Sequence, residues 1–211
     1  MNLPHTSQAE SYLEALVKEL GIPTSRYDQA EKSYKSLAEW LSRKDSQVAV
    51  FSPEIYVQGS FRLGTVIKPQ SDDEEYDIDF VCVLNDFSKT MLSQERLKEL
   101  IGEEVKQYRI SKCMSKEAIE GRRCWTLEYS DGAQFHMDIL PALPENDNYR
   151  QLLEARNLTS SFADTAIVIT DNQEASYRLI TDDWPRSNPK GYSEWFKGRQ
   201  KEIFNSKRQG I

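Results

Sequence analysis

The sequence predicts an α+β fold in which a β-sheet is backed by helices near the N-terminus. Apolar residues recur at helical spacing between Tyr12 and Leu20, whereas residues 77–80 and 135–139 alternate between apolar and polar as strand residues do. The chain has 211 residues, which is enough for one substantial hydrophobic core. We therefore expect a globular protein, and no internal repeat is visible in the sequence.

Two helices are expected before the sheet. Ser7 begins the first and is followed three residues later by Glu10, the pattern of a capping box, and Gly21 ends it. The second helix begins at Pro23-Thr24 and is predicted to run to about Lys44. Both helices are expected to pack behind the sheet.

A hairpin is expected in the second half of the chain. Arg122–Tyr129 and Gln134–Leu140 are its strands, and Asp131-Gly132 between them is a favoured two-residue turn. Pro141 and Pro144 are expected to end the pairing. The remaining predicted elements are a strand at 54–58, helices at 93–108 and 148–155, strands at 166–170 and 177–181, and a last helix opening at 187–192.

The segment from 57 to 83 carries the chemistry. Residues two apart in a strand share a face, so Asp77 and Asp79 project together while Ile78, Phe80 and Cys82 point into the core. Two carboxylates held this close repel each other unless a cation lies between them. Oxygen ligands of this kind suit Mg²⁺, which leaves its other positions to water and substrate phosphates.

The motif Gln58-Gly59-Ser60 supplies a phosphate-binding turn. Glycine lets the backbone approach a phosphate closely, and Ser60 offers a hydroxyl and an N–H, best placed if a helix begins there. Arg62 follows closely and is expected to contact triphosphate oxygens. Lys68 is as consistent with a solvated loop charge as with a phosphate contact.

A third acid, Asp138, lies in the second strand of the predicted hairpin. Asp138 and His136 share one face of that strand. Three strand-borne carboxylates that face a phosphate-binding turn can hold two metal ions for in-line phosphoryl transfer. His136 is more consistent with a residue at the rim than with a catalytic one.

The order of these motifs resembles that of the polymerase-β-type nucleotidyltransferase superfamily. The longer strings QGSFRLGTVIKP, DIDFV, FHMDILPA and SNPKGYSEWF resemble one branch of it, the bacterial cGAS/DncV-like nucleotidyltransferases (CD-NTases), which make cyclic oligonucleotide signals in anti-phage defence. The resemblance implies a polymerase-β-like core with a mixed β-sheet over residues 1–185. Residues 186–211 would then begin a C-terminal helical domain, most of which this sequence does not contain.

The resemblance also implies an activity, joining nucleoside triphosphates into a cyclic di- or oligonucleotide. Asp77 and Asp79 would bridge two Mg²⁺ ions, or Mn²⁺ as the alternative, and Asp138 would share one ion and act as general base. Gln58, Gly59, Ser60 and Arg62 would bind the nucleotide. Regulatory or effector proteins of a defence operon are implied as partners.

Two other functions remain open from the sequence. One is a linear nucleotidyltransferase that acts on RNA or protein, which its macromolecular product would distinguish. The other is a truncated, non-catalytic nucleotide-binding domain, which would bind nucleotide with metal and form no product.

Composition narrows the cellular role. The 27 basic and 34 acidic residues give a net charge of −7, which argues against general nucleic-acid binding. The three cysteines lack zinc-site spacing and suggest no disulfide framework. The N-terminus does not resemble a signal peptide, and no apolar run approaches the roughly 20 residues that cross a bilayer. We therefore expect a soluble, cytoplasmic protein.

Overall fold

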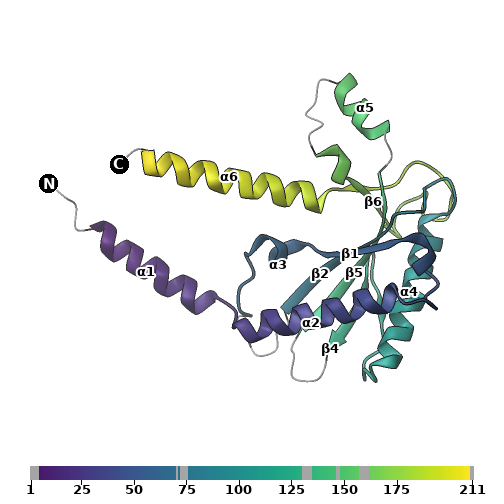
Figure 1. The fold of residues 1–211 in the computed structure, drawn as a ribbon, viewed down its shortest axis with the longest axis horizontal. Helices are drawn as coiled ribbons and strands as arrows, with labels where there is room; N and C mark the ends of the chain where they lie inside the picture. The colour runs from purple at the N-terminus through teal and green to yellow at the C-terminus, as the bar shows by residue number, and fades with distance from the viewer. Residues whose placement is uncertain are drawn as a thin grey trace.

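The computed structural model describes residues 5–69, 71, 76–129, 135–145, 148–156 and 162–209, which form one mixed β-sheet with helices around it (Figure 1). The α-helices are α1 (His5–Leu20), α2 (Thr24–Leu41), α3 (Gly59–Leu63), α4 (Gln94–Ser111), α5 (Asn148–Ala155) and α6 (Pro189–Gln209). The strands are β1 (Pro53–Val57), β2 (Tyr76–Leu84), β3 (Ile119–Glu120), β4 (Trp125–Tyr129), β5 (Phe135–Pro144), β6 (Ile167–Ile169) and β7 (Arg186–Ser187).

The sheet has the strand order β1-β2-β5-β4-β3, and β6 pairs with both β5 and β7. β2 and β5 run parallel, whereas the other pairs of strands in this sheet are antiparallel. This mixed sheet confirms the predicted fold class. The parallel pair at its centre matters most, because it carries all three aspartates of the sequence motifs.

The two faces of the sheet are buried to different extents. Helices α2 and α4 cover one face, where Ile78, Phe80 and Cys82 of β2 are at most 1% exposed, as the alternation predicted. On the other face a smaller apolar cluster lies toward the carboxyl ends of β2 and β5, and it contains Tyr56, Val81, Val83, Leu140, Ala142, Ile167 and Ile169. The amino ends of the same strands, on that second face, carry the aspartates.

Only one of the two N-terminal helices packs as predicted. Helix α2 buries Ala30, Leu37 and Leu41 against the core. The expectation was wrong for α1, whose Tyr12 is 68% and Val17 70% exposed. The reason is that α1 ends at Leu20 and the chain changes direction before α2 begins at Thr24. Helix α1 therefore extends away from the sheet, on the same side of the molecule as α6 (Figure 1).

Two predictions about β structure need correction. The hairpin pairing of β4 with β5 does end at Ile139, before Pro141, but β5 itself continues to Pro144 and pairs there with β6, and the carbonyl of Pro141 accepts a hydrogen bond from Thr170 N (3.3 Å). Proline removes a donor but keeps its acceptor, so a strand can pass through it. Residues 177–181 form turns rather than a strand, and Leu179 there is exposed.

The other predicted elements lie near their expected positions, and Ser93 caps α4 by accepting a hydrogen bond from Arg96 N (3.2 Å). The predicted turn at Asp131-Gly132 lies outside the described residues. The short strand β7, which pairs with β6, was missed. None of the described helices is long and apolar enough to cross a membrane.

Candidate active site

Four polar side chains form two rows on one face of the parallel strands β2 and β5. In the register, Asp77 lies beside His136 and Asp79 lies beside Asp138. Within each strand the two members are two residues apart, so they share the face that α2 and α4 leave uncovered. The register of one parallel strand pair therefore brings together all three predicted carboxylates, with His136 among them.

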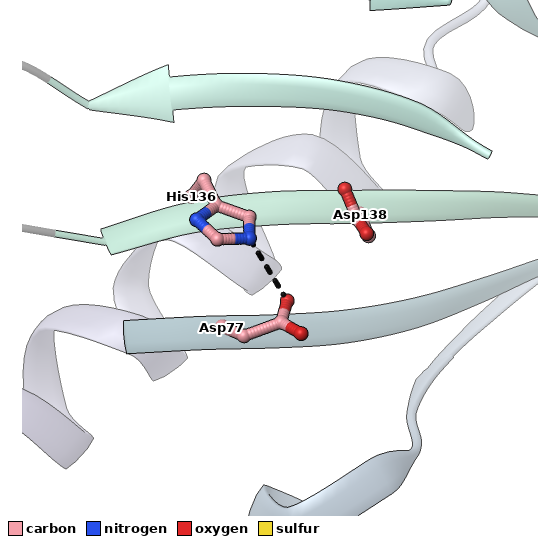
Figure 2. A group of neighbouring side chains, drawn as sticks. All are labelled: Asp77, His136 and Asp138. Carbon is pink, nitrogen blue, oxygen red and sulfur yellow. Dashed lines mark ion pairs between the residues drawn. The ribbon is translucent and has the colours of Figure 1, made fainter. Parts of the chain in front are cut away.

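Three of these groups are close enough to share a small cation. His136 Nε2 lies 3.3 Å from Asp77 Oδ1, the contact drawn as a dashed line in Figure 2. One ligand atom each from Asp77, His136 and Asp138 lie within 4.8 Å of one another. The side chain of Asp77 is 55% and that of His136 31% exposed, so the group is open to solvent on one side.

The carboxylates of the cluster lie close enough to disfavour one another's ionised form. Burial raises the pKa of Asp79 to about 6, with further increases from the neighbouring Asp77 and Asp138 carboxylates, and His136 acts in the opposite direction. A carboxyl group whose pKa is raised by like charges is one that a bound cation would stabilise in its ionised form. The donor set of three carboxylates fits a divalent ion that prefers oxygen, as Mg²⁺ and Mn²⁺ do.

The Gly59 turn lies directly against Asp79. Gly59 has φ of +62°, and a Cβ atom added there would lie 2.1 Å from Asp79 Oδ2. Gln58 extends the edge of the sheet by donating its N–H to the carbonyl of Asp79 at 2.9 Å. Helix α3 begins at Gly59, so Ser60 lies in its first turn, as the phosphate-binding interpretation requires.

Arg62 lines a cavity of about 400 Å³ beside this turn, together with Gln58, Gly59, Leu63, Asp79, Ser187, Asn188, Pro189 and Tyr192. Its guanidinium lies over the ring of Tyr56 (5.7 Å), and its Nε is buried without a hydrogen-bond partner among the described residues. A buried guanidinium N–H without an acceptor is the kind of group that an anionic ligand would satisfy. Lys68 instead lies near Glu19 of α1, with 3.9 Å between Nζ and Oε1.

A second cavity, of about 260 Å³, lies on the Asp138 side of Asp79. It is lined by Gln58, Asp79, Arg123, Cys124, Asp138, Leu140, Ile169 and Ser187. Thr126 on β4 donates its hydroxyl to Asp138 Oδ1 at 2.5 Å and so fixes that carboxylate. Burial, followed by the charge of Asp138, raises the pKa of Cys124 to about 12, so this thiol stays protonated near neutral pH.

Arg123 is held beside the second cavity by a buried acid. The Asp171 carboxylate is 0% exposed and accepts hydrogen bonds from Arg122 Nε (2.8 Å) and Arg123 Nε (2.9 Å). Burial alone would raise the pKa of Asp171, but these bonds and one from Gln173 N outweigh it and lower that pKa to about 2. The result is a fixed positive charge at a cavity that contains two carboxylates.

Sequence reasoning missed Arg123, Thr126 and Ser187. Thr126 lies on a predicted strand of the hairpin, but a two-residue turn at Asp131-Gly132 would set it opposite Met137, one residue away from Asp138, which is its partner in the structure. Arg123 and Ser187 gave no signal, since they reach the site through the packing of the segments around β6 and β7.

A cavity near α4 is a different environment. It measures about 620 Å³ and contains none of the motif residues; its lining is Glu95, Glu99, Glu120, Asn172, Glu174, Ala175, Tyr177 and Arg178. Four glutamates against one arginine would repel a triphosphate. The predicted phosphate-binding turn and two of the predicted carboxylates instead line the two cavities around Asp79.

Comparison with known proteins identifies the family. Residues 8–200 match the family model of the Second Messenger Oligonucleotide or Dinucleotide Synthetase (SMODS) domain. The chain belongs to the SMODS family. The resemblance to bacterial CD-NTases that the motifs predicted is thereby confirmed.

Among curated proteins, a c-di-GMP synthase of Roseivirga ehrenbergii is 26% identical over 190 residues, covering 90% of this SMODS chain and 43% of that relative. The chain thus spans less than half the length of this relative.

Solved structures share the fold. Bradyrhizobium diazoefficiens CdnG in complex with GTP matches with a TM-score of 0.59 and 19% identity, over 84% of this chain and 43% of that one. Escherichia coli DncV in its 3′-deoxy GTP bound form matches with a TM-score of 0.61 and 13% identity, over 89% and 60%. At these identities the structures establish the polymerase-β-like nucleotidyltransferase architecture.

Proposed function

We propose that this SMODS chain carries a nucleotidyltransferase site that joins nucleoside triphosphates into a cyclic di- or oligonucleotide. One observation carries the proposal: Asp77, Asp79 and Asp138 share one sheet face, and the Gly59 turn lies directly against Asp79. A carboxylate cluster beside a phosphate-binding turn is the arrangement that phosphoryl transfer needs, because catalysis there consists mainly of positioning and charge neutralisation.

The three aspartates would hold two Mg²⁺ ions, or Mn²⁺ ions, which when bound neutralise triphosphate charge and lower the pKa of the attacking ribose hydroxyl. Arg62 binds the triphosphate in the larger of the two cavities, where its buried Nε needs an acceptor, and Ser60, in the first turn of α3, donates to it from beside that cavity. A ribose oxygen forms a bond to the α-phosphorus as the bond to the pyrophosphate oxygen breaks. Asp138, oriented by Thr126, accepts the hydroxyl proton.

Two adjoining cavities support the use of two nucleotides. Gln58, Asp79 and Ser187 line both of them, so Asp79 lies between a site for the triphosphate donor and a site for the nucleotide that provides the hydroxyl. Arg123 supplies positive charge at the second site. A second transfer, after the linear product has turned round, closes the ring.

The substrate class agrees with what similar proteins are named for. The curated relative is a c-di-GMP synthase, and a Rhodothermus marinus CdnE with a TM-score of 0.52 and 17% identity is a c-UMP-AMP synthase. Residues 186–211, which include the whole of α6, would lead into a helical region that closes over the nucleotides. The product would act as a second messenger in anti-phage defence and be read by an effector protein.

The test is incubation of the chain with all four ribonucleoside triphosphates and Mg²⁺ or Mn²⁺, followed by mass spectrometry of the products. A chain with Asp77→Asn and Asp79→Asn serves as the matched control. A phosphatase-resistant cyclic product that only the unsubstituted chain makes is the expected result. Linear extension of RNA would favour the alternative nucleotidyltransferase activity, and metal-dependent nucleotide binding without any product would favour a non-catalytic domain. Absence of nucleotide binding would overturn the proposal.

A further inference from the structure

His136 occupies a position in the carboxylate cluster that the proposed mechanism leaves without a role. It lies beside Asp77 in the register of β2 and β5, and its Nε2 faces Asp77 Oδ1 at 3.3 Å (Figure 2). Asp138 follows it by two residues on the same face of β5. One ligand atom from each of these three residues lies within 4.8 Å of the others.

These separations are close to those that a metal ion imposes. Neighbouring ligands of an octahedral ion with bonds of about 2.1 Å lie about 3.0 Å apart, and opposite ligands lie about 4.2 Å apart. The distance from His136 Nε2 to Asp77 Oδ1 is 3.3 Å, and no separation in the group exceeds 4.8 Å. Small side-chain rotations therefore suffice to bring one nitrogen and two oxygens onto a single ion.

The surroundings of His136 also suit a ligand. Glu128 of β4 lies opposite His136 in the register, on the side away from Asp77. Histidines that bind metals are commonly oriented by a carboxylate or carbonyl on their second nitrogen. The two strands beside His136 thus each carry an acid at the neighbouring register position, and the Glu128 carboxylate also pairs with Lys116.

We propose that His136 is a nitrogen ligand of a divalent-metal site formed with Asp77 and Asp138, and that it biases this site toward first-row transition ions such as Mn²⁺ over Mg²⁺. The inference rests on the proposed function for the existence of the ion and goes beyond it in the choice of ion. Mg²⁺ prefers oxygen ligands, whereas imidazole nitrogen is a ligand for transition metals. An all-carboxylate site would have less of this preference, because carboxylate oxygens suit Mg²⁺ and Mn²⁺ alike.

The rival explanation is that His136 only orients Asp77 through their contact. His136→Gln separates the two, because a glutamine side chain keeps an N–H donor for Asp77 but offers an amide oxygen instead of an imidazole nitrogen. The chain contains two histidines, so His5→Gln, at the beginning of α1, is the matched control.

The experiment is pulsed electron paramagnetic resonance of the chain loaded with one equivalent of Mn²⁺, read for the modulation from a directly bound ¹⁴N nucleus. We expect this modulation in the unsubstituted chain and in His5→Gln, and its loss in His136→Gln. Calorimetric titration of the same proteins should show Mn²⁺ affinity falling about tenfold or more in His136→Gln. Mg²⁺ affinity should fall by less than about threefold, because Mg²⁺ gains little from nitrogen.

Other results overturn the inference. Mn²⁺ that binds without ¹⁴N modulation, or modulation that persists in His136→Gln, would exclude the imidazole ligand. Equal losses of Mn²⁺ and Mg²⁺ affinity would assign His136 to the positioning of Asp77. Asp79→Asn distinguishes a failure of this inference from a failure of the proposed function. If the unsubstituted chain binds Mn²⁺ without a nitrogen signal and Asp79→Asn loses that binding, the proposed metal site stands and only the role of His136 is refuted. A chain that binds neither ion refutes both.

Discussion

Gly59→Ala tests whether the phosphate-binding turn and the carboxylate cluster form one site. Gly59 has φ of +62°, where an L residue with a side chain pays about 1–2 kcal/mol. The added Cβ would also lie 2.1 Å from Asp79 Oδ2, whereas ordinary contacts begin at 3.4 Å. Either the carboxylate or the turn must therefore move by roughly 1 Å, a misplacement that can reduce catalysis about 10²-fold.

Gly64 provides the matched control. It ends α3 with φ of +70°, so alanine there carries the same conformational penalty, but a Cβ would meet nothing within 4 Å. Urea denaturation should thus show Gly64→Ala destabilised by about 1–2 kcal/mol, and Gly59→Ala by at least as much because of the added contact with Asp79. Calorimetric titration with Mn²⁺ and a non-hydrolysable nucleoside triphosphate should show a loss of affinity of about tenfold or more for Gly59→Ala only.

The reasoning fails if the two variants lose nucleotide affinity to the same extent, because the effect would then come from the left-handed backbone alone. It also fails if Gly59→Ala binds metal and nucleotide normally, since the position of Asp79 would then not depend on the conformation of the turn.

The ionisable groups and Thr126 give three more measurable effects. The raised pKa of Asp79, about 6 against 3.8, favours the protonated acid in the fold, so stability from this group is complete below pH 3.8 and is lost as the pH rises through 6. The full pKa shift corresponds to roughly 3 kcal/mol, which solvent screening reduces to about 1–2 kcal/mol. Urea denaturation without metal at pH 8 should therefore show Asp79→Asn more stable than the unsubstituted chain by about 1–2 kcal/mol, and this difference should halve near pH 5. Asp171 has the opposite sign, because its pKa of about 2 against 3.8 gives stability that is present above pH 3.8 and lost as the pH falls through 2. Asp171→Asn should accordingly lower the free energy of unfolding by about 1–2 kcal/mol at pH 7, and by less at pH 3. Thr126→Val removes the hydrogen bond to Asp138 and should slow product formation about tenfold with nucleotide affinity unchanged, while Thr126→Ser restores the rate.

The sequence alone determined the content of the site. The alternation in β2 assigned Asp77 and Asp79 to one face and Ile78 to the other, and the same rule grouped His136 with Asp138. These assignments follow from the two-residue period of a strand, which is a local property of the backbone. The turn at Gly59 could likewise be predicted, because a positive φ and a close approach to another chain segment both favour glycine.

The tertiary structure alone decided which of these groups meet. A period of two fixes the face but not the neighbouring strand or the register, and both depend on contacts between residues far apart in the chain. The parallel register of β2 and β5 set Asp79 beside Asp138 and Asp77 beside His136, and a buried Asp171 brought Arg123 to the second cavity. The exposed apolar side of α1 has the same origin, since helical periodicity predicts a stripe but cannot say whether the rest of the chain covers it.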